Sequence, residues 1–197
     1  MATAFSESEK ELIRIKLNSA AQECLGKFGV KKTTVDQLAQ MAGISKGAFY
    51  IFYPSKESLF FKVFEEYQNS IIDEMFNELN ELESVGSEEL SDLIYEIYKK
   101  VRHSFIMNII ENQELEYLMR KIPEKDILDH HSFDDIFIKK LLLHLKVKKD
   151  VEIGTVSASL RAIFMTMLHV KEIGEKDFDN ALKLLISGLL QQLIEED

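Results

Sequence analysis

The sequence predicts an all-α protein. Apolar residues recur at intervals of three and four along most of the chain, which is the spacing of one face of a helix. Only two prolines and eight glycines interrupt the 197 residues, and no segment alternates apolar and polar residues as a half-buried strand does. Hydrophobic residues make up 46% of the chain, which is enough for a folded globular protein.

Two helices are predicted up to residue 43. The first begins in SESEKE at residues 6–11, which contains two overlapping capping-box patterns, and it ends at Gly29. The second begins after Thr34, with Gln37 three residues later as in another capping box. Gly43 is predicted to end this second helix, because glycine accepts the left-handed conformation that commonly follows a helix.

A third, short helix is predicted between Ser45, its N-cap, and Pro54. With the second helix and the turn at Gly43, it forms a helix-turn-helix across residues 34–53. In this motif the second helix enters the DNA major groove, and the residues at its N-terminus meet the base edges. The residues in that position are Lys46, Gly47 and Ala48. Two of the three have almost no side chain, so we expect the helix end to approach the groove closely.

Six further helices are predicted after Pro54. The first is a long helix capped by Ser55 that reaches about Leu82. The others cover about 88–108, 111–121, 133–147, 154–171 and 177–195. Residues 1–55 are therefore predicted to form a three-helix DNA-binding domain. Residues 56–197 are predicted to form a larger helical domain for ligand binding and dimerisation.

The charge is distributed unevenly along the chain. The net charge is −10, yet residues 1–64 contain nine basic and six acidic residues, against fifteen and twenty-eight in the remainder. Such asymmetry indicates two tasks in one chain. Neither a signal peptide nor an unbroken apolar run of roughly 20 residues is present, so a cytoplasmic protein without a membrane partner is predicted. The single cysteine, Cys24, is interpreted as a small buried hydrophobe rather than a reactive thiol.

One stretch carries a family resemblance. NSAAQECLGKFGVKKTTVDQLAQMAGISKGAFYIFYPSKESLF, about 43 residues from Asn18 to Phe60, resembles the N-terminal domain of the tetracycline-repressor (TetR-type) family of bacterial regulators. The shared features are the paired alanines, Thr-Thr-Val, Ala-Gly-Ile-Ser-Lys-Gly, the Phe-Tyr pair and Pro-Ser-Lys-Glu. The sequence departs from the family at Phe52-Tyr53, where Tyr-Phe or His-Phe is frequent, so the polar tip has moved by one residue.

The resemblance implies a set of DNA contacts. Phosphate contacts would come from Thr34 and Lys56, and base contacts from the start of the third helix. Tyr53 is equally compatible with a phosphate contact and with a place in the core. The full predicted set is Thr34, Ser45, Lys46, Gly47, Ala48, Tyr50, Tyr53 and Lys56. Lys56 also stands out because a cation in the first turn of a helix opposes the helix dipole, which suits a phosphate clamp. The alternative is a solvated surface lysine.

The C-terminal helices predict a homodimer. Residues 182–193 are apolar nearly all round, and a helix without a polar face must be buried on both sides. A second copy of the chain is the simplest cover for the outer side, and the resemblance implies the same pair of helices. The predicted interface residues are Val156, Leu160, Leu182, Leu185, Ile186, Leu189 and Leu193. The alternative is a buried core helix in a monomer.

Large, soft and aromatic residues in the middle of the chain predict a pocket for a small apolar effector. They are Tyr98, His103, Phe105, Met107, Tyr117, Met119, Phe137, Phe164 and Met167. At helical spacing the same residues are also compatible with an ordinary core. The acidic excess favours a neutral or cationic ligand.

No cofactor, metal site or enzymatic activity is predicted. The stretch DHHSFDD at residues 129–135 places His130, His131, Asp134 and Asp135 together, but without further ligands nearby we interpret it as a polar helix start. The predicted function is a ligand-responsive regulator, most simply a repressor that binds a palindromic operator as a homodimer and is released by an apolar molecule. The alternatives are a helical ligand- or partner-binding protein that no longer binds DNA, and an enzyme on a helical scaffold.

Overall fold

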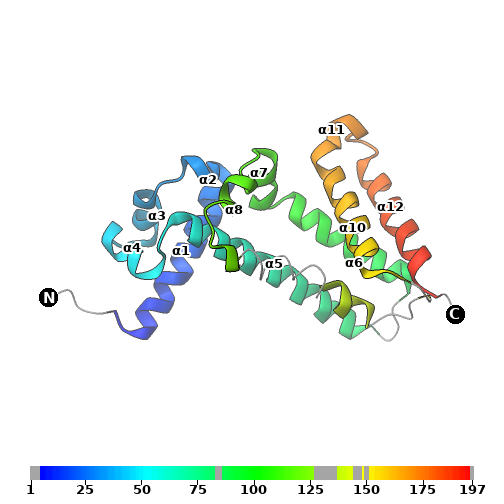
Figure 1. Cartoon of the computed structure of the whole chain (residues 1–197), viewed down its shortest axis with the longest axis horizontal. Coiled ribbons are helices and arrows are strands. Elements are labelled where there is room, and N and C mark those ends of the chain that lie inside the picture. The colour runs from blue at the N-terminus through cyan, green and yellow to red at the C-terminus, as the bar shows by residue number, and fades with distance from the viewer. Residues whose placement is uncertain (1–4, 83–85, 127–136, 144–147, 149–150, 196–197) are drawn as a thin grey trace. The chain divides into compact units, whose positions relative to one another are not determined.

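The computed structural model describes residues 5–82, 86–126, 137–143, 148 and 151–195 (Figure 1). Every element within these ranges is a helix, which confirms the predicted all-α fold. The candidate metal stretch at 129–135 lies outside the described residues. Within the described ranges, no group of three or more His, Cys, Asp or Glu side chains is arranged to hold a metal ion.

The chain divides into two compact units. Unit 1 comprises residues 1–68 and 103–127, and unit 2 comprises residues 69–102 and 128–197. The long helix α5 (Lys56–Glu81) contributes to both units. The predicted domain boundary after residue 55 remains a prediction.

Unit 1 contains the N-terminal helices and one later segment. Its elements besides the first part of α5 are α1 (Glu7–Lys27), α2 (Gly29–Lys32), α3 (Val35–Ala42), α4 (Lys46–Phe52), α7 (Phe105–Glu111) and α8 (Leu115–Met119). Helix α1 packs against both α3 and α7 (Figure 1). Leu17, Ala21 and Leu25 on α1 are fully buried at these contacts. Cys24 is buried beside them as predicted, and this burial raises the pKa of its thiol.

The first helices begin and end as the sequence predicts. The Ser6 hydroxyl accepts a hydrogen bond from the backbone N–H of Glu9, and the Glu9 carboxylate accepts one from the N–H of Ser6 at 2.8 Å. Thr34 and Gln37 form the same reciprocal capping box at the start of α3. Such caps satisfy backbone donors that a helix cannot pair internally.

Helix α2 is the main feature that the sequence does not predict in unit 1. Gly29 has φ +77°, as expected for a residue that ends α1, but the chain then forms a single helical turn instead of an extended link. Further along, the predicted helix at 88–108 is two helices, because Ser104 caps the start of α7. Its hydroxyl accepts a hydrogen bond from the N–H of Ile106 at 3.2 Å.

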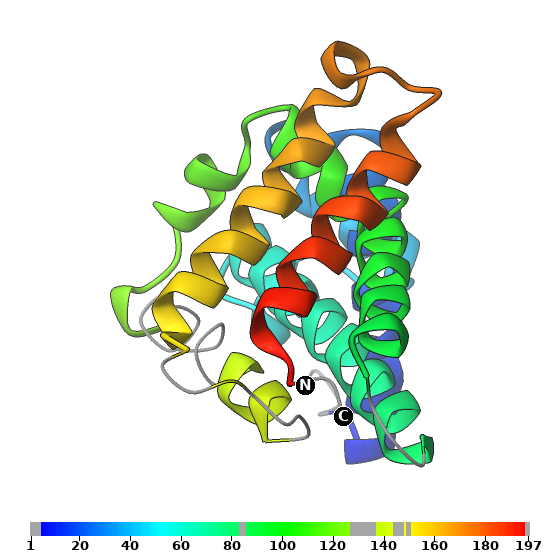
Figure 2. The ribbon, with the colours of Figure 1, turned by 90° about the vertical axis from the view of Figure 1, so that its right-hand side faces the viewer.

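Unit 2 is built around the C-terminal helix α12 (Phe178–Leu193), which packs against α6 (Ser87–Arg102) and α10 (Ile153–Met165). Figure 2 shows α10 and α12 side by side. The predicted helix at 154–171 corresponds to α10, the 3-10 turn η1 (Thr166–His169) and the short helix α11 (Val170–Ile173). By length and composition alone the helical stretch Ile153–Ile173 could cross a membrane, a criterion that core helices of soluble proteins also meet.

Candidate DNA-binding surface

Helices α3 and α4 and the turn between them have the geometry predicted for a helix-turn-helix. Gly43 has φ 73°, and its N–H donates to the carbonyls of Ala39 and Gln40. The N–H of Ile44 donates to Ala39 at 2.9 Å, so the turn closes the carbonyl end of α3. The conformation is left-handed, which explains why glycine stands at this position.

The N-terminus of α4 is exposed and its opposite side is buried. The Ser45 hydroxyl accepts a hydrogen bond from the N–H of Ala48 at 3.1 Å and caps the helix. Phe49 is fully buried, whereas Tyr50 is 51% exposed and its ring packs edge-on against Phe49. The predicted base-reading residue Lys46 is also exposed. The helix therefore presents the predicted DNA-contacting face to solvent.

Gly47 lies on this open face. A Cβ added at Gly47 would meet, within 4 Å in the described part of the chain, only the Oγ of Ser45 at 3.9 Å. Close packing against another helix therefore does not explain the glycine. Glycine at an exposed helix position is unfavourable for helix formation, so the stability of α4 does not explain it either.

Lys46 has a partner that the sequence does not reveal. Its ammonium group lies 2.8 Å from a carboxylate oxygen of Asp36 on α3. This hydrogen bond and the negative charge of Asp36 raise the pKa of Lys46. The pair connects the two helices of the motif on their exposed side.

Two other predicted contact residues have structural roles in the helices. The Thr34 hydroxyl accepts a hydrogen bond from the N–H of Gln37 at 3.2 Å, so it caps α3 while remaining exposed. Tyr53 is partly buried, with its ring 6.2 Å from that of Phe49. Its burial and, to a smaller extent, the negative charge of Glu66 raise the pKa of its phenol. Of the two readings of Tyr53, this position favours the core.

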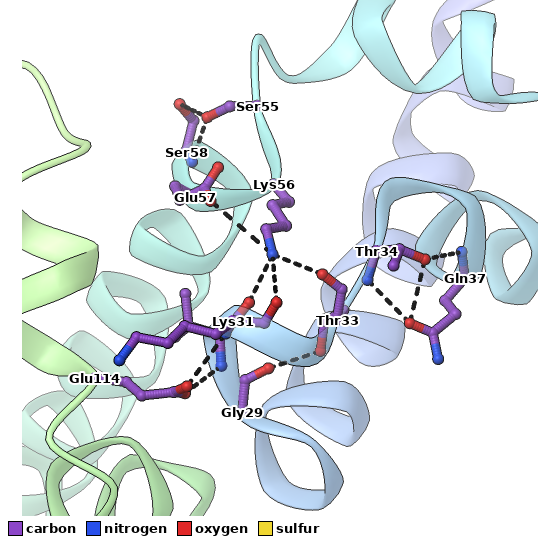
Figure 3. Close-up of polar contacts among 11 residues, drawn as sticks. Gly29, Lys31, Thr33, Thr34, Gln37, Ser55, Lys56, Glu57, Ser58 and Glu114 are labelled. Atoms are coloured by element: carbon purple, nitrogen blue, oxygen red, sulfur yellow. Dashed lines mark hydrogen bonds and ion pairs between the residues drawn. The ribbon is translucent and has the colours of Figure 1, made fainter.

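Lys56 is bound to the protein itself. Its Nζ donates hydrogen bonds to the backbone carbonyls of Val30 at 2.7 Å, Lys31 at 3.3 Å and Thr33 at 2.6 Å (Figure 3). The side chain is only 16% exposed. The Glu57 carboxylate lies 4.0 Å from the same ammonium group, so the predicted phosphate contact would have to compete with these partners.

A buried carboxylate faces the other end of the same turn. Glu114, between α7 and α8, is 7% exposed and accepts hydrogen bonds from the backbone N–H groups of Val30 and Lys31 (Figure 3). Sequence reasoning missed Glu114, because nothing local distinguishes it from a surface acid. In the structure, a Cβ at Gly29 would collide with this carboxylate.

The predicted pocket residues are divided between the two units. In unit 2, the ring of Tyr98 lies 5.7 Å from that of Phe164 in an edge-on arrangement, and Met167 is buried. The Tyr98 hydroxyl donates to the carbonyl of Leu160 at 2.8 Å. Phe137 contacts Phe76.

The predicted residues in unit 1 are His103, Phe105, Met107, Tyr117 and Met119. Of these, Met107 is buried, His103 is exposed and the other three are partly buried.

The predicted interface residues lie on two sides of α10 and α12. Val156, Leu182 and Ile186 are buried within the unit, so their side chains already have partners in the same chain. Leu185 is 48% exposed, and Leu160, Leu189 and Leu193 are partly buried. Leu184, which sequence reasoning did not single out, is 74% exposed on the outer side of α12.

This arrangement of short helices defines the class of the protein. An exposed α4 is capped at its N-terminus, packed through Phe49 and joined to α3 by a left-handed glycine, as in helix-turn-helix DNA-binding proteins.

The family follows from comparison with known proteins. The profile described as "Bacterial regulatory proteins, tetR family" matches residues 17–63, about a quarter of the chain, so the N-terminal helices form a tetR-family DNA-binding domain. The predicted resemblance is thereby confirmed.

Curated relatives match over part of the chain. The uncharacterized HTH-type transcriptional regulator YuxN of Bacillus subtilis is 37% identical over 71 residues, which cover 36% of this chain and 23% of that protein. The fatty acid metabolism regulator protein of the same organism is 22% identical over 111 residues, covering 56% of this chain and 57% of that protein. The match therefore spans about a quarter of the first relative and just over half of the second.

Solved structures share the whole fold. A transcriptional regulator FadR from Bacillus subtilis, solved in complex with stearoyl-CoA, has a TM-score of 0.65 at 17% identity, covering 90% of this chain and 98% of that one. NalD, the secondary repressor of the MexAB-OprM multidrug efflux pump in Pseudomonas aeruginosa, has a TM-score of 0.56 at 17% identity, covering 97% and 100%. At these identities the likeness establishes the fold alone.

Proposed function

We propose that the protein is a cytoplasmic, ligand-responsive transcriptional repressor that binds a palindromic operator as a homodimer and is released by a small, largely apolar molecule. The observation that carries the DNA-binding part is the open face of α4 at Gly47. There the backbone is bare although no described neighbour requires it. A bare helix N-terminus can approach base edges and phosphates more closely than one covered by long side chains.

The operator is expected to be read by the start of α4. Lys46 is the cation of this segment, and exchanging its Asp36 partner for a base or phosphate oxygen would keep the ammonium group satisfied. Gly47 and Ala48 allow the approach, and Tyr50 extends from the same exposed surface. These side chains form the specificity-determining part of the proposal, whereas phosphate contacts provide affinity without reading sequence.

The outer side of α12 supports the homodimer. Leu184 and Leu185 are exposed there, and Gly188 follows one turn later with open space where a side chain would be. Exposed leucines beside a bare backbone position suit close contact with a second helix. A two-fold dimer would also supply the two DNA-binding domains that a palindromic site needs, about one helical turn of DNA apart.

The interior of unit 2 supports an apolar effector. Tyr98, Phe164 and Met167 contribute large apolar surfaces, and the buried hydroxyl of Ser157 has no hydrogen-bond partner among the described residues. A buried polar group without a partner is unfavourable unless a ligand or water supplies one. Because the FadR structure contains stearoyl-CoA, acyl compounds with long chains are the first effectors to test.

DNA binding can be tested directly. The purified protein should retard the DNA that flanks its own gene, with an affinity that falls steeply as salt concentration rises. Binding that is equally weak to flanking and random DNA at every salt concentration would favour a helical ligand-binding protein that no longer binds DNA. Mass spectrometry of the purified protein would identify a retained effector, and adding that compound should release the DNA.

A further inference from the structure

The single turn of α2 is held at both ends by charged side chains from elsewhere in unit 1. The Glu114 carboxylate accepts hydrogen bonds from the N–H groups of Val30 and Lys31 at the start of the turn. The Lys56 ammonium donates to the carbonyls of Val30, Lys31 and Thr33 at its end (Figure 3). We call this arrangement the α2 clamp.

A four-residue helix needs such support. It is too short to pair its own first N–H groups or its last carbonyls, and buried backbone groups without partners are strongly unfavourable. Gly29 and Val30 are buried, so water does not replace these partners. The charges also have the favourable signs, because an acid lies at the N-terminus of the turn and a base at its C-terminus.

Gly29 fits the clamp in shape as well as in conformation. A Cβ at this position would overlap the carboxylate of Glu114, and φ +77° would strain any other residue. Gln113, directly before Glu114, has φ 54°, which is unusual for a residue with a side chain. This left-handed residue ends α7, because the N–H groups of Gln113 and Glu114 donate to the carbonyls of Ile110 and Ile109. The end of α7 thus places Glu114 beside α2, and glycine at position 29 leaves room for the carboxylate.

The clamp is adjacent to the start of the helix-turn-helix. The Thr33 carbonyl accepts a hydrogen bond from Lys56, and the Thr33 hydroxyl donates one to the carbonyl of Gly29 at 2.7 Å. The next residue is Thr34, the N-cap of α3. Glu114 belongs to the segment 103–127, which the chain enters directly from unit 2 after Arg102. One carboxylate therefore connects the chain returning from unit 2 to the origin of the DNA-reading helices.

We propose that Lys56 and Glu114 are positioning residues for DNA binding. Lys56 fixes α2 to α5, Glu114 fixes it to the segment 103–127, and displacement of that segment disorders the start of α3 through Glu114. The inference rests on the proposed DNA-binding function and extends it. It assigns Lys56 an indirect role in place of a direct phosphate contact.

Hydrogen exchange on the full-length protein tests the clamp without DNA. Glu114→Ala should accelerate exchange of the amides from Val30 to Ala42 by about tenfold or more, with the amides of α6 and α12 unchanged. Glu114→Gln should restore part of the protection, because its amide oxygen still accepts a hydrogen bond but carries no charge. The matched control is Glu116→Gln, which alters an exposed carboxylate two residues away that pairs with Arg120. Unchanged protection in Glu114→Ala, or equal acceleration in both units, overturns the proposal.

Salt-dependent DNA binding separates positioning from direct contact. Lys56→Met should weaken operator binding by about tenfold while leaving the slope of log affinity against log salt unchanged. Lys62→Met is the control, since Lys62 is exposed on the same helix and pairs with Glu66. A slope shallower by nearly two units in the dimer, at about 0.9 per contact, would make Lys56 a phosphate ligand and overturn the inference. If the wild type binds no DNA, the proposed function fails, and hydrogen exchange alone then decides the clamp.

Discussion

The ammonium group of Lys46 on α4 lies 2.8 Å from the carboxylate of Asp36 on α3. The pair joins the two helices of the DNA-binding motif on their exposed side, where Lys46 is 54% and Asp36 68% exposed. Exposed ion pairs of this kind contribute about 0–1 kcal/mol to stability. The Lys46–Asp36 pair matters more for DNA binding than for stability, because Asp36 places a negative charge beside the residues proposed to enter the major groove.

Asp36→Asn should therefore increase affinity for random duplex DNA. The change removes a charge that repels phosphates and frees Lys46, so affinity should rise several-fold at low salt and less at high salt. Fluorescence anisotropy with random and operator duplexes measures the effect. Asp92→Asn is a suitable control, since Asp92 forms a similar exposed pair with Lys183 in unit 2. Random-duplex affinity that stays constant or falls would contradict the prediction.

Leu185→Glu should convert the dimer into a folded monomer. Leu185 is 48% exposed in the single chain, so a charge there is tolerated by the monomer but would be buried against a partner at a cost of several kcal/mol. Sedimentation velocity and circular dichroism report the two properties separately. Lys183→Gln, an exposed substitution on the side of α12 where Lys183 pairs with Asp92 of α6, should remain dimeric. A wild type that sediments as a folded monomer would refute the dimer.

Ser157→Ala should leave the ligand-free protein equally stable or make it more stable. The hydroxyl is buried without a partner among the described residues, and removing an unsatisfied polar group recovers up to about 1–3 kcal/mol of desolvation penalty. Thermal unfolding of ligand-free protein provides the measurement. If the hydroxyl contacts an effector, the same variant should also release DNA less readily when effector is added. A clearly lower melting temperature would show that the hydroxyl is already satisfied.

Phe164→Ala should weaken the response to effector more than it weakens DNA binding. Phe164 is partly buried against Tyr98, so its truncation is tolerated better than that of the fully packed Met167, where a large cavity would cost about 2–5 kcal/mol. Operator titrations with and without effector give both quantities. Equal losses of DNA binding and response, with the melting temperature unchanged, would place the effector elsewhere.

Local patterns predict the helix-turn-helix well. The N-caps Thr34 and Ser45 and the left-handed Gly43 stand close in sequence to the helices that they start or end, so their roles can be derived from spacing alone. These features determine most of the proposed DNA-binding surface.

Long-range polar contacts are the part that the sequence does not predict. Glu114 bonds to Val30 across 84 positions, and helical periodicity carries no information about such a pairing. Lys56 is recognisable as a cation placed unfavourably for its own helix dipole, but its actual partners are carbonyls of another helix. The sequence also does not predict which leucines of α12 are exposed. Leu184 and Ile186 are both apolar, and only the packed structure shows that Leu184 is exposed and Ile186 is buried.

The most direct test of DNA reading by α4 is the Gly47→Glu variant, with melting temperature and operator affinity measured on the same preparation. Space is open at this position, and glutamate is favoured over glycine in a helix by up to about 1 kcal/mol, so the melting temperature should remain the same or rise slightly. Operator binding should be lost, because the side chain adds bulk and a negative charge where the helix must approach DNA. Operator affinity equal to that of the wild type, or a large fall in melting temperature, would contradict the account.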